Sequence, residues 1–226
     1  KSNFNKNIKI NSSIDKDIKL QLDLDSEKKI IDILKKHTEF SILSEEMGSC
    51  NKFNSEYKWI VDPIDGSLNY SRSIPLCCIS IGLWKKKKPI LGVVYDFMHD
   101  NLYTGIVGGN AKKNNVCIKT SNISDKKNSI ICTGVPINST LNLETIDLLV
   151  DNLKKYKKNR FLGSAALSLV LVAEGAVEAY NEENIFIWDV AGAIPIVLAA
   201  GGKCKINFSD VKNLLSVYAT NGVLNY

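Results

Sequence analysis

Residues 59–70 read Trp59-Ile-Val-Asp62-Pro-Ile-Asp65-Gly66-Ser67-Leu-Asn-Tyr70, and this stretch decides which fold and chemistry the sequence predicts. A short apolar run typical of a β-strand leads into two carboxylates three residues apart, and Gly66-Ser67 then opens the next segment. Carboxylate oxygens are the ligands that Mg²⁺ prefers, and the free N–H groups at a helix start bind anions. The stretch therefore predicts a site for a divalent cation and a phosphate at the end of a strand.

Length, composition and charge are ordinary for a globular protein. The chain has 226 residues, of which 45% are hydrophobic and 23% charged, enough for one large domain or two smaller lobes. The net charge of +5 comes mainly from lysine-rich runs at 85–88 and 154–158. Aromatic side chains do not interleave with these bases in a nucleic-acid pattern, so no nucleic-acid partner is expected.

Cysteine usage and the lengths of the apolar runs bear on location. The six cysteines form neither a CxxC pair nor zinc-ligand spacing, which predicts reduced thiols in a cytoplasmic protein. No apolar run reaches the roughly 20 residues needed to cross a bilayer, so no membrane partner is expected. The chain begins with Lys1, and we expect its N-terminus to be trimmed or incomplete.

Hydrophobic periodicity predicts an α+β lobe with a largely antiparallel sheet, followed by a lobe of α/β layers. Helices are expected at 26–36, 141–153, 165–173 and 189–200, and strands at 40–43, 57–61, 77–84, 90–97, 101–107, 129–134 and 176–180. The polar segment 121–128 is the best boundary, which divides the chain into an N-terminal lobe (1–125) and a C-terminal lobe (126–226).

Acidic residues fall at the ends of several expected elements, where they can converge on one cleft: Asp25, Glu45, Asp62, Asp65 and Asp189. Each alone has a simpler interpretation. Asp25 can cap a helix, Glu45 can lie in a solvated loop, and Asp189 can open a helix, where the helix dipole favours a negative charge. The Asp62–Asp65 segment can be a turn. Buried carboxylates repel one another and resist ionisation, however, so a cation is their natural compensation.

Three motifs in register resemble the inositol monophosphatase family of Mg²⁺-dependent, lithium-sensitive phosphatases. The motifs are Ser44-Glu45-Glu46, Asp62-Pro-Ile-Asp65-Gly-Ser67-Leu-Asn69, and Trp188-Asp189-Val-Ala-Gly-Ala followed by Ala200-Gly201-Gly202. The resemblance runs from about Asp17 to Asn221. It implies a layered α-β-α-β-α fold of the sugar-phosphatase type, in which the N-terminal lobe carries most metal ligands and the C-terminal lobe carries Asp189.

The resemblance also implies a set of metal ligands for two or three Mg²⁺ ions. The expected ligands are the side chains of Glu45, Asp62, Asp65 and Asp189 and the main-chain carbonyl of Ile64. Magnesium ions at such a site lower the pKa of bound water, neutralise phosphate oxygens and stabilise the leaving oxygen.

Catalytic and substrate-binding roles follow from the same resemblance. Asp25 is expected to accept a hydrogen bond from the Ser67 hydroxyl, so that this pair orients and deprotonates the attacking water, while Glu45 assists at the third ion. The expected substrate-binding residues are Asp65, Gly66, Ser67, Gly163, Ser164, Ala165, Glu182 and Asp189. Among them, the N–H groups of Gly66 and Ser67 bind the phosphate, and Glu182 contacts substrate hydroxyls.

The chain departs from the family pattern in a few places. Ser67 stands where threonine is usual, which keeps the hydroxyl and loses a methyl group. Gly109-Asn110-Ala111 replaces a Gly-x-Gly-Ala turn. The resemblance leads us to expect a first long helix that would lie largely before Lys1 and a final helix after Asn221.

The expected activity is Mg²⁺-dependent hydrolysis of a small phosphate monoester, with inositol monophosphate or a related polyol or sugar phosphate as the default substrate. Fructose-1,6-bisphosphatase and 3′(2′),5′-bisphosphate nucleotidase activities are the alternatives within this chemistry. The nucleotidases usually carry Lys-Glu after their Asp-Gly-Thr, where this chain has Leu68-Asn69-Tyr70. A non-catalytic regulatory protein of the same fold is the alternative of another class. A homodimer is also compatible with the resemblance.

Overall fold

The computed structural model describes residues 10–14, 17–50, 55–135 and 143–224. Over these residues, eight strands form one mixed sheet in the order β10-β9-β8-β7-β6-β5-β3-β4. Their bounds are β3 (Ser41–Ser44), β4 (Gly48–Cys50), β5 (Tyr57–Asp65), β6 (Cys78–Lys85), β7 (Lys88–Asp96), β8 (Asn101–Ile106), β9 (Ala111–Lys113) and β10 (Val116–Ile118). All neighbours in this sheet are antiparallel except β3 and β5, which run parallel.

A second sheet of five described strands has the order β12-β11-β13-β15-β14. Its strands are β11 (Ile130–Thr133), β12 (Lys158–Arg160), β13 (Ala179–Phe186), β14 (Lys203–Phe208) and β15 (Leu214–Thr220). Strand β11 runs parallel to both of its neighbours, whereas β13, β15 and β14 pair antiparallel. A separate hairpin is formed by β1 (Ile10–Ile14) and β2 (Asp17–Leu20).

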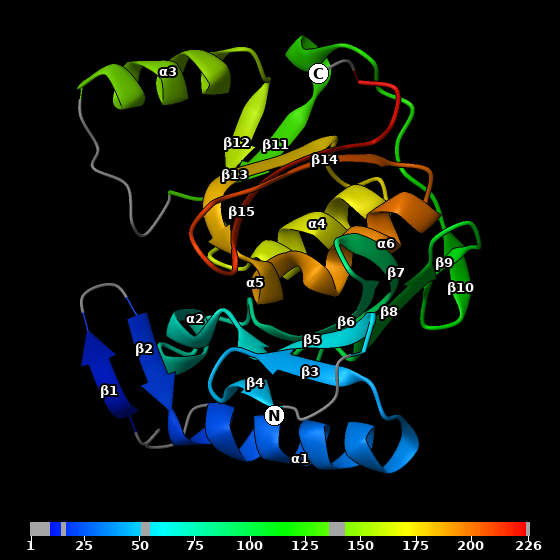
Figure 1. The fold of residues 1–226 in the computed structure, drawn as a ribbon. Helices are drawn as coiled ribbons and strands as arrows, with labels where there is room; N and C mark the ends of the chain where they lie inside the picture. Colours follow the sequence, from blue (N-terminus) through cyan, green and yellow to red (C-terminus); the bar gives the residue numbers. More distant parts are fainter. Residues whose placement is uncertain (1–9, 15–16, 51–54, 136–142, 225–226) are drawn as a thin grey trace.

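The helices lie in three layers around these sheets (Figure 1). They are α1 (Gln21–His37), α2 (Ser67–Ser71), α3 (Leu143–Lys154), α4 (Ala165–Ala173), α5 (Ile187–Ala191) and α6 (Ala193–Ala199), with a 3₁₀ turn at Lys126–Asn128. Helix α1 covers the outer face of the large sheet, α4, α5 and α6 fill the space between the sheets, and α3 lies beyond the small sheet. The expected α-β-α-β-α layering is confirmed.

One hydrophobic core joins the two halves of the chain. The largest cluster of buried side chains includes Trp84 from β6 and Leu169 from α4. The Trp84 indole also donates a hydrogen bond to the carbonyl of Ala191 at 3.0 Å. The boundary expected near residue 125 falls between the two sheets, and a division into separate domains at 1–125 and 126–226 stays a prediction.

Helix α1 begins at Gln21, five residues before the expected start. The buried stripe of this helix is Asp23, Glu27 and Ile31, at the i, i+4, i+8 spacing of one helix face. Because two of the three are charged, hydrophobic periodicity does not reveal the first turn. The Glu27 carboxylate is fully buried and accepts hydrogen bonds from Ser44 Oγ at 2.6 Å and from the N–H groups of Glu46 and Met47.

Other differences from the expected elements lie in both parts of the chain. The strand expected at 176–180 is Ala179–Phe186, and the helix expected at 189–200 is divided at Gly192 into α5 and α6. The elements that the periodicity does not predict include strands β1, β4, β12, β14 and β15 and helix α2. Residues 141–142 of the expected helix at 141–153 lie outside the described residues. No helix among the described residues is both long and apolar enough to span a membrane.

A row of glycines lets the central helices lie directly on the large sheet. Gly82, Gly92 and Gly105 are register partners across β6, β7 and β8. A Cβ atom at these positions would meet, respectively, Ala191 O, Gly192 O and Ile196 Cα. These atoms belong to the backbone and cannot rotate away, so the glycines fix how closely α5 and α6 approach the sheet.

We expect Gly92→Ala to destabilise the protein by about 1–3 kcal/mol or more, because the new methyl group overlaps backbone atoms of the helix junction. Gly109→Ala is the control, since Gly109 is exposed and an added Cβ would lie 3.3 Å from its nearest neighbour, Ile106 O. Urea unfolding measures both variants. A Gly92→Ala variant within about 0.5 kcal/mol of the unmutated protein would contradict this packing role.

Candidate active site

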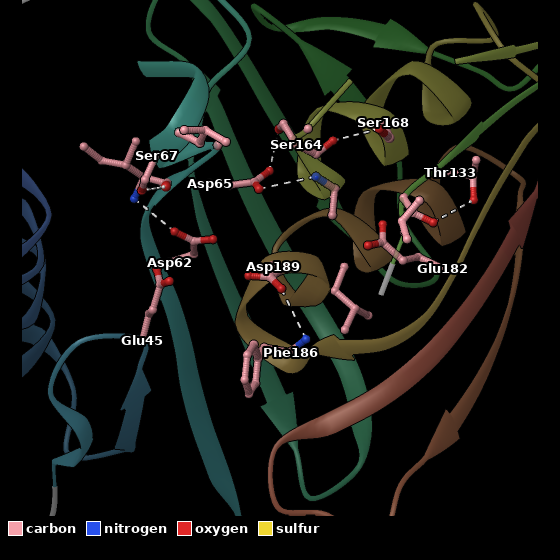
Figure 2. Close-up of a pocket in the computed structure, with 18 of the residues that line it drawn as sticks. Glu45, Asp62, Asp65, Ser67, Thr133, Ser164, Ser168, Glu182, Phe186 and Asp189 are labelled. Carbon is pink, nitrogen blue, oxygen red and sulfur yellow. Dashed lines mark hydrogen bonds between the residues drawn. The ribbon is translucent and has the colours of Figure 1, made fainter. Parts of the chain in front are cut away.

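A pocket of about 280 Å³ lies where the ends of β5, β11 and β13 meet the starts of α4 and α5 (Figure 2). It is lined by every site residue expected from the sequence except Asp25, namely Glu45, Asp62, Ile64, Asp65, Gly66, Ser67, Gly163, Ser164, Ala165, Glu182 and Asp189. The lining residues not expected from the sequence are Leu68, Thr133, Gly134, Val135, Ser168, Asn184, Ile185 and Phe186.

The turn after β5 brings its two carboxylates to the pocket. The pairing of β5 with β6 shifts register between Asp62 and Asp65, and such an irregularity re-aims side chains. Asp62 Oδ1 accepts a hydrogen bond from the N–H of Ile64 at 3.0 Å. Gly66 has a φ of 86°, and an added Cβ would lie 2.7 Å from Leu76 O, so only glycine fits this turn.

Burial and mutual repulsion dominate the electrostatics of the pocket. Asp62 is 1% exposed, and burial followed by the charges of Glu45, Asp65 and Asp189 raises the pKa of its carboxyl well above the ordinary value. The pKa of Asp189 is raised by burial and by the charges of Glu45, Asp65 and Glu182. Both groups resist ionisation in the absence of a compensating positive charge.

Asp65 belongs both to this acidic group and to the start of α4. Burial raises its pKa to about 6, against hydrogen bonds that favour the charged form. Its carboxylate accepts these bonds from the Ser164 hydroxyl and from the N–H groups of Ala165 and Ala166. Asn69 fixes the preceding loop, because its Nδ2 donates to the carbonyl of Leu162 at 2.8 Å. The first turn of α4 is therefore tied to the β5 turn.

Asp189 enters the pocket from the short helix α5. Its Oδ2 accepts a hydrogen bond from the N–H of Phe186 at 3.2 Å, which holds the carboxylate at the first turn of the helix. The rings of Phe186 and Trp188 stack with centroids 4.6 Å apart on the adjacent part of the chain. Because α5 rests on the glycine row, the glycine packing also sets the position of Asp189.

The oxygen-rich donor set suits hard divalent cations. Five carboxylates line one pocket with Ile64, and the repulsion among the carboxylates is what bound cations would cancel. Among the described residues, no three acidic, histidine or cysteine side chains converge tightly enough to form a ready metal cage. The chemistry of the oxygen donors that line the pocket fits magnesium.

The structure does not bring Asp25 into the pocket, which corrects one expectation from the sequence. Asp25 is exposed on α1 and accepts a hydrogen bond from Gln21 Nε2 at 3.0 Å. Asp23, two residues earlier, is 1% exposed, and its charge contributes to the raised pKa of Asp62. The Ser67 hydroxyl donates to the carbonyl of Ile64 at 2.8 Å. The two-residue difference turns the side chain to another face of the helix.

Glu182 lies on the opposite wall, at the small sheet (Figure 2). The Tyr180 hydroxyl donates to its Oε2 at 2.8 Å. Burial and the charge of Asp65 raise the pKa of Glu182 to about 7, while the bond from Tyr180 opposes this shift. The pocket thus has an acidic wall from β5 and α5, and a second wall from β11, β13 and the start of α4.

Comparison with known proteins identifies relatives of the chain. A model of the inositol monophosphatase family matches residues 1–213. The Nus factor SuhB of Pasteurella multocida (strain Pm70) is 33% identical over 189 residues, which cover 82% of this chain and 71% of that protein. The fructose-1,6-bisphosphatase/inositol-1-monophosphatase of Aquifex aeolicus (strain VF5) is 34% identical over 206 residues, covering 89% of this chain and 78% of that protein.

Solved structures agree with this relationship. The inositol monophosphatase from Anabaena (Nostoc) sp. PCC 7120 aligns with a TM-score of 0.81 and 34% identity, over 89% of this chain and 81% of that chain. Two mixed sheets around a central helical layer are the fold that this chain shares with a class of phosphatases. The chain belongs to the inositol monophosphatase family.

We expect Asp62→Asn to raise the Tm by a few degrees when metal is chelated, because the change removes one of several repelling buried charges and keeps the side-chain oxygen. The raised pKa of Asp62 means that ionisation opposes folding, so the stability of the unmutated protein falls as the pH rises above the ordinary Asp range. The difference in Tm between Asp62→Asn and the unmutated protein should therefore increase from pH 4 to pH 8.

Added Mg²⁺ provides the matched comparison in the same thermal melts. It should raise the Tm of the unmutated protein more than that of Asp62→Asn, since a bound ion stabilises only the state that binds it. Equal stabilisation of both proteins, or a lower Tm for the variant in chelator, would show that Asp62 does not take part in a cation site.

Asp23 and Asp25 provide a second test, since they differ by two residues on one helix. We expect Asp23→Asn to lower kcat by about 100-fold or more, the scale of a lost general base, and Asp25→Asn to leave kcat unchanged. Steady-state phosphate release measures both variants, with thermal melts confirming the fold. The reverse pattern would restore Asp25 to the site.

Proposed function

We propose that the chain hydrolyses a small phosphate monoester with magnesium, and that its substrate is inositol monophosphate or a related polyol or sugar phosphate. Family membership supports a phosphatase function. The observation that carries the proposal is the pocket itself, where buried, repelling carboxylates face a second wall that includes Glu182. A polyol phosphate needs a pocket with two halves, one that holds cations for its phosphate group and one that binds the hydroxyl groups of its alcohol part.

In this proposal the carboxylates and one carbonyl hold two or three Mg²⁺ ions. The ligands are Glu45, Asp62, Asp65, Asp189 and the Ile64 carbonyl. Bound magnesium would supply a water of lowered pKa and positive charge for the phosphate oxygens. The chain's own part is to keep these oxygens in fixed places, through the β5 turn, the capped start of α4 and the first turn of α5.

The attacking water is oriented by the Ser67 hydroxyl together with a carboxylate from α1. Asp23 takes this role in place of Asp25, since it is buried and its charge acts on Asp62. Ser67 is a short distance along the chain from Asp62 and donates to the Ile64 carbonyl, so its hydroxyl is held at the pocket. Glu45 lies at the edge of the acidic wall, where it would assist at the third ion.

Phosphate and alcohol occupy neighbouring parts of the pocket in this arrangement. The N–H groups of Gly66 and Ser67 bind the phosphate at the start of the turn after β5. The segment Gly163-Ser164-Ala165 and the Glu182 carboxylate receive the alcohol part of the ester. Neutral hydroxyl groups suit this wall because a carboxylate accepts hydrogen bonds and repels a second anion.

Other substrates and a non-catalytic role define the competing proposals. The Aquifex relative is named for both fructose-1,6-bisphosphate and inositol-1-phosphate chemistry, so a sugar bisphosphate is the second candidate. The Pasteurella relative is named as a Nus factor, which motivates a regulatory alternative. The buried carboxylates favour an enzyme, because a protein that only binds partners gains nothing from holding repelling charges together. Lithium sensitivity, a cytoplasmic location and a homodimer belong to the same proposal.

We expect the unmutated protein to release phosphate from inositol 1-phosphate with Mg²⁺, and Asp189→Asn to lose this activity with its fold intact. The reason is that Asp189 enters the pocket as a ligand, and isosteric replacement removes its charge alone. A panel that adds fructose 1,6-bisphosphate and adenosine 3′,5′-bisphosphate ranks substrates by kcat/KM. Absence of Mg²⁺-dependent release from every ester, or normal turnover by Asp189→Asn, would reject the proposal.

A further inference from the structure

Gly134 lies directly beneath the carboxylate of Glu182. An ideal Cβ at Gly134 would overlap the carboxyl carbon and both oxygens of that side chain. The backbone of Gly134 does not have the positive φ that favours glycine elsewhere in the chain, so its conformation is open to other residues. An added methyl group at position 134 would therefore occupy the space that the Glu182 carboxylate takes, and the side chain of Glu182 would have to move.

The ends of the two strands that carry these residues are held in register. Strands β11 and β13 run parallel, with Thr133 opposite Asn181. The Thr133 hydroxyl donates to the Asn181 carbonyl at 2.6 Å, one residue away from both Gly134 and Glu182. The glycine is consequently fixed relative to the strand that presents Glu182, and the carboxylate cannot avoid an added methyl group by a shift of the strand end.

Tyr180 holds the same carboxylate from its other side. It lies two residues before Glu182 on β13, so both side chains point to the same face of the strand. Tyr180 is 1% exposed, and burial and the charge of Glu182 keep its pKa well above the ordinary value. Its hydroxyl therefore stays protonated and donates to Glu182 Oε2. Figure 2 shows the Glu182 carboxylate on the wall of the pocket opposite Asp62.

We propose that Gly134 and Tyr180 are positioning residues that hold Glu182 in one orientation, so that its carboxylate selects esters whose alcohol part carries a free hydroxyl group. The inference rests on the proposed function and names what decides the substrate class. Glu182 is the group that contacts the alcohol, and the other two act through it. An aryl phosphate, which has no hydroxyl group to donate, does not use this contact.

The test compares inositol 1-phosphate with p-nitrophenyl phosphate in variants at positions 134 and 180. Gly134→Ala should lower kcat/KM for inositol 1-phosphate about tenfold or more, mainly through KM, and leave p-nitrophenyl phosphate nearly unchanged. Tyr180→Phe removes only the hydroxyl that donates to Glu182, and it should also lower kcat/KM for inositol 1-phosphate relative to that for p-nitrophenyl phosphate. Gly109→Ala, on the exposed surface, is the control and should leave kcat/KM unchanged for both substrates.

A double-mutant cycle with Glu182→Ala separates positioning from general damage. In that background, Gly134→Ala should have no further effect on the ratio of the two substrates, because the group it displaces is gone. Additive losses, an equal fall for both substrates, or an unchanged ratio in Gly134→Ala would each overturn the inference.

Crystal structures of the unmutated protein and Gly134→Ala keep this test distinct from that of the proposed function. If the unmutated protein shows no Mg²⁺-dependent release of phosphate from any ester tested, the proposed function fails, and the position of the Glu182 carboxylate then decides the inference. A carboxylate displaced in Gly134→Ala supports the positioning role. A carboxylate that lies in the same place in both structures overturns it.

Discussion

Repulsion among buried carboxylates is the constraint on which the rest of this structure depends. Asp62 and Asp65 are 1% and 7% exposed, and the charges of Glu45 and Asp189 act on the same pocket. Unpaired charges in such a place oppose folding, so the surrounding structure has to hold them. It does so with backbone atoms and helix starts, which do not move away when the charges repel. Cations complete the site by removing the repulsion that the fold sustains.

Close packing of backbone against backbone provides that resistance. The glycines of β6, β7 and β8 bring α5 onto the large sheet, and the Asp65 carboxylate joins the β5 turn to the first turn of α4. The glycine row lies within its strands and contacts the end of α5, and the Asp65 bonds lie at the start of α4, so both devices act next to the carboxylates. A small change in either would move a charged group by a distance that matters for ligand geometry. The contacts that make the fold rigid are therefore the same contacts that hold the carboxylates of the site in place.

Local patterns predict a lobe with an antiparallel sheet followed by α/β layers, and the motifs shared with the family imply the full layering and most of the residues that line the pocket. Asp62 and Asp65 lie at the end of β5 beside Pro63 and Gly66, and Asp189 lies in the first turn of α5. The resemblance places the catalytic carboxylate at Asp25, whereas Asp23 is the one of the two that lies on the buried face of α1. Because this face begins with charged residues, hydrophobic periodicity does not show where the helix starts. The contact of Gly134 with Glu182 joins residues 48 positions apart on parallel strands. Only the strand order brings it about, and no local pattern could have indicated it.

The two walls of the pocket have different physical tasks and come from different sheets. The acidic wall belongs to β5 and α5, where substitutions alter charge and cation affinity together. The Glu182 wall belongs to β11 and β13, and its contacts there are with Gly134 and Tyr180. Since neither neighbour belongs to the acidic wall, this side can be remodelled while the cation ligands stay in place. Because the two walls are separate, one fold can keep its cation ligands while the other wall is adapted to different esters, such as the two for which the Aquifex relative is named.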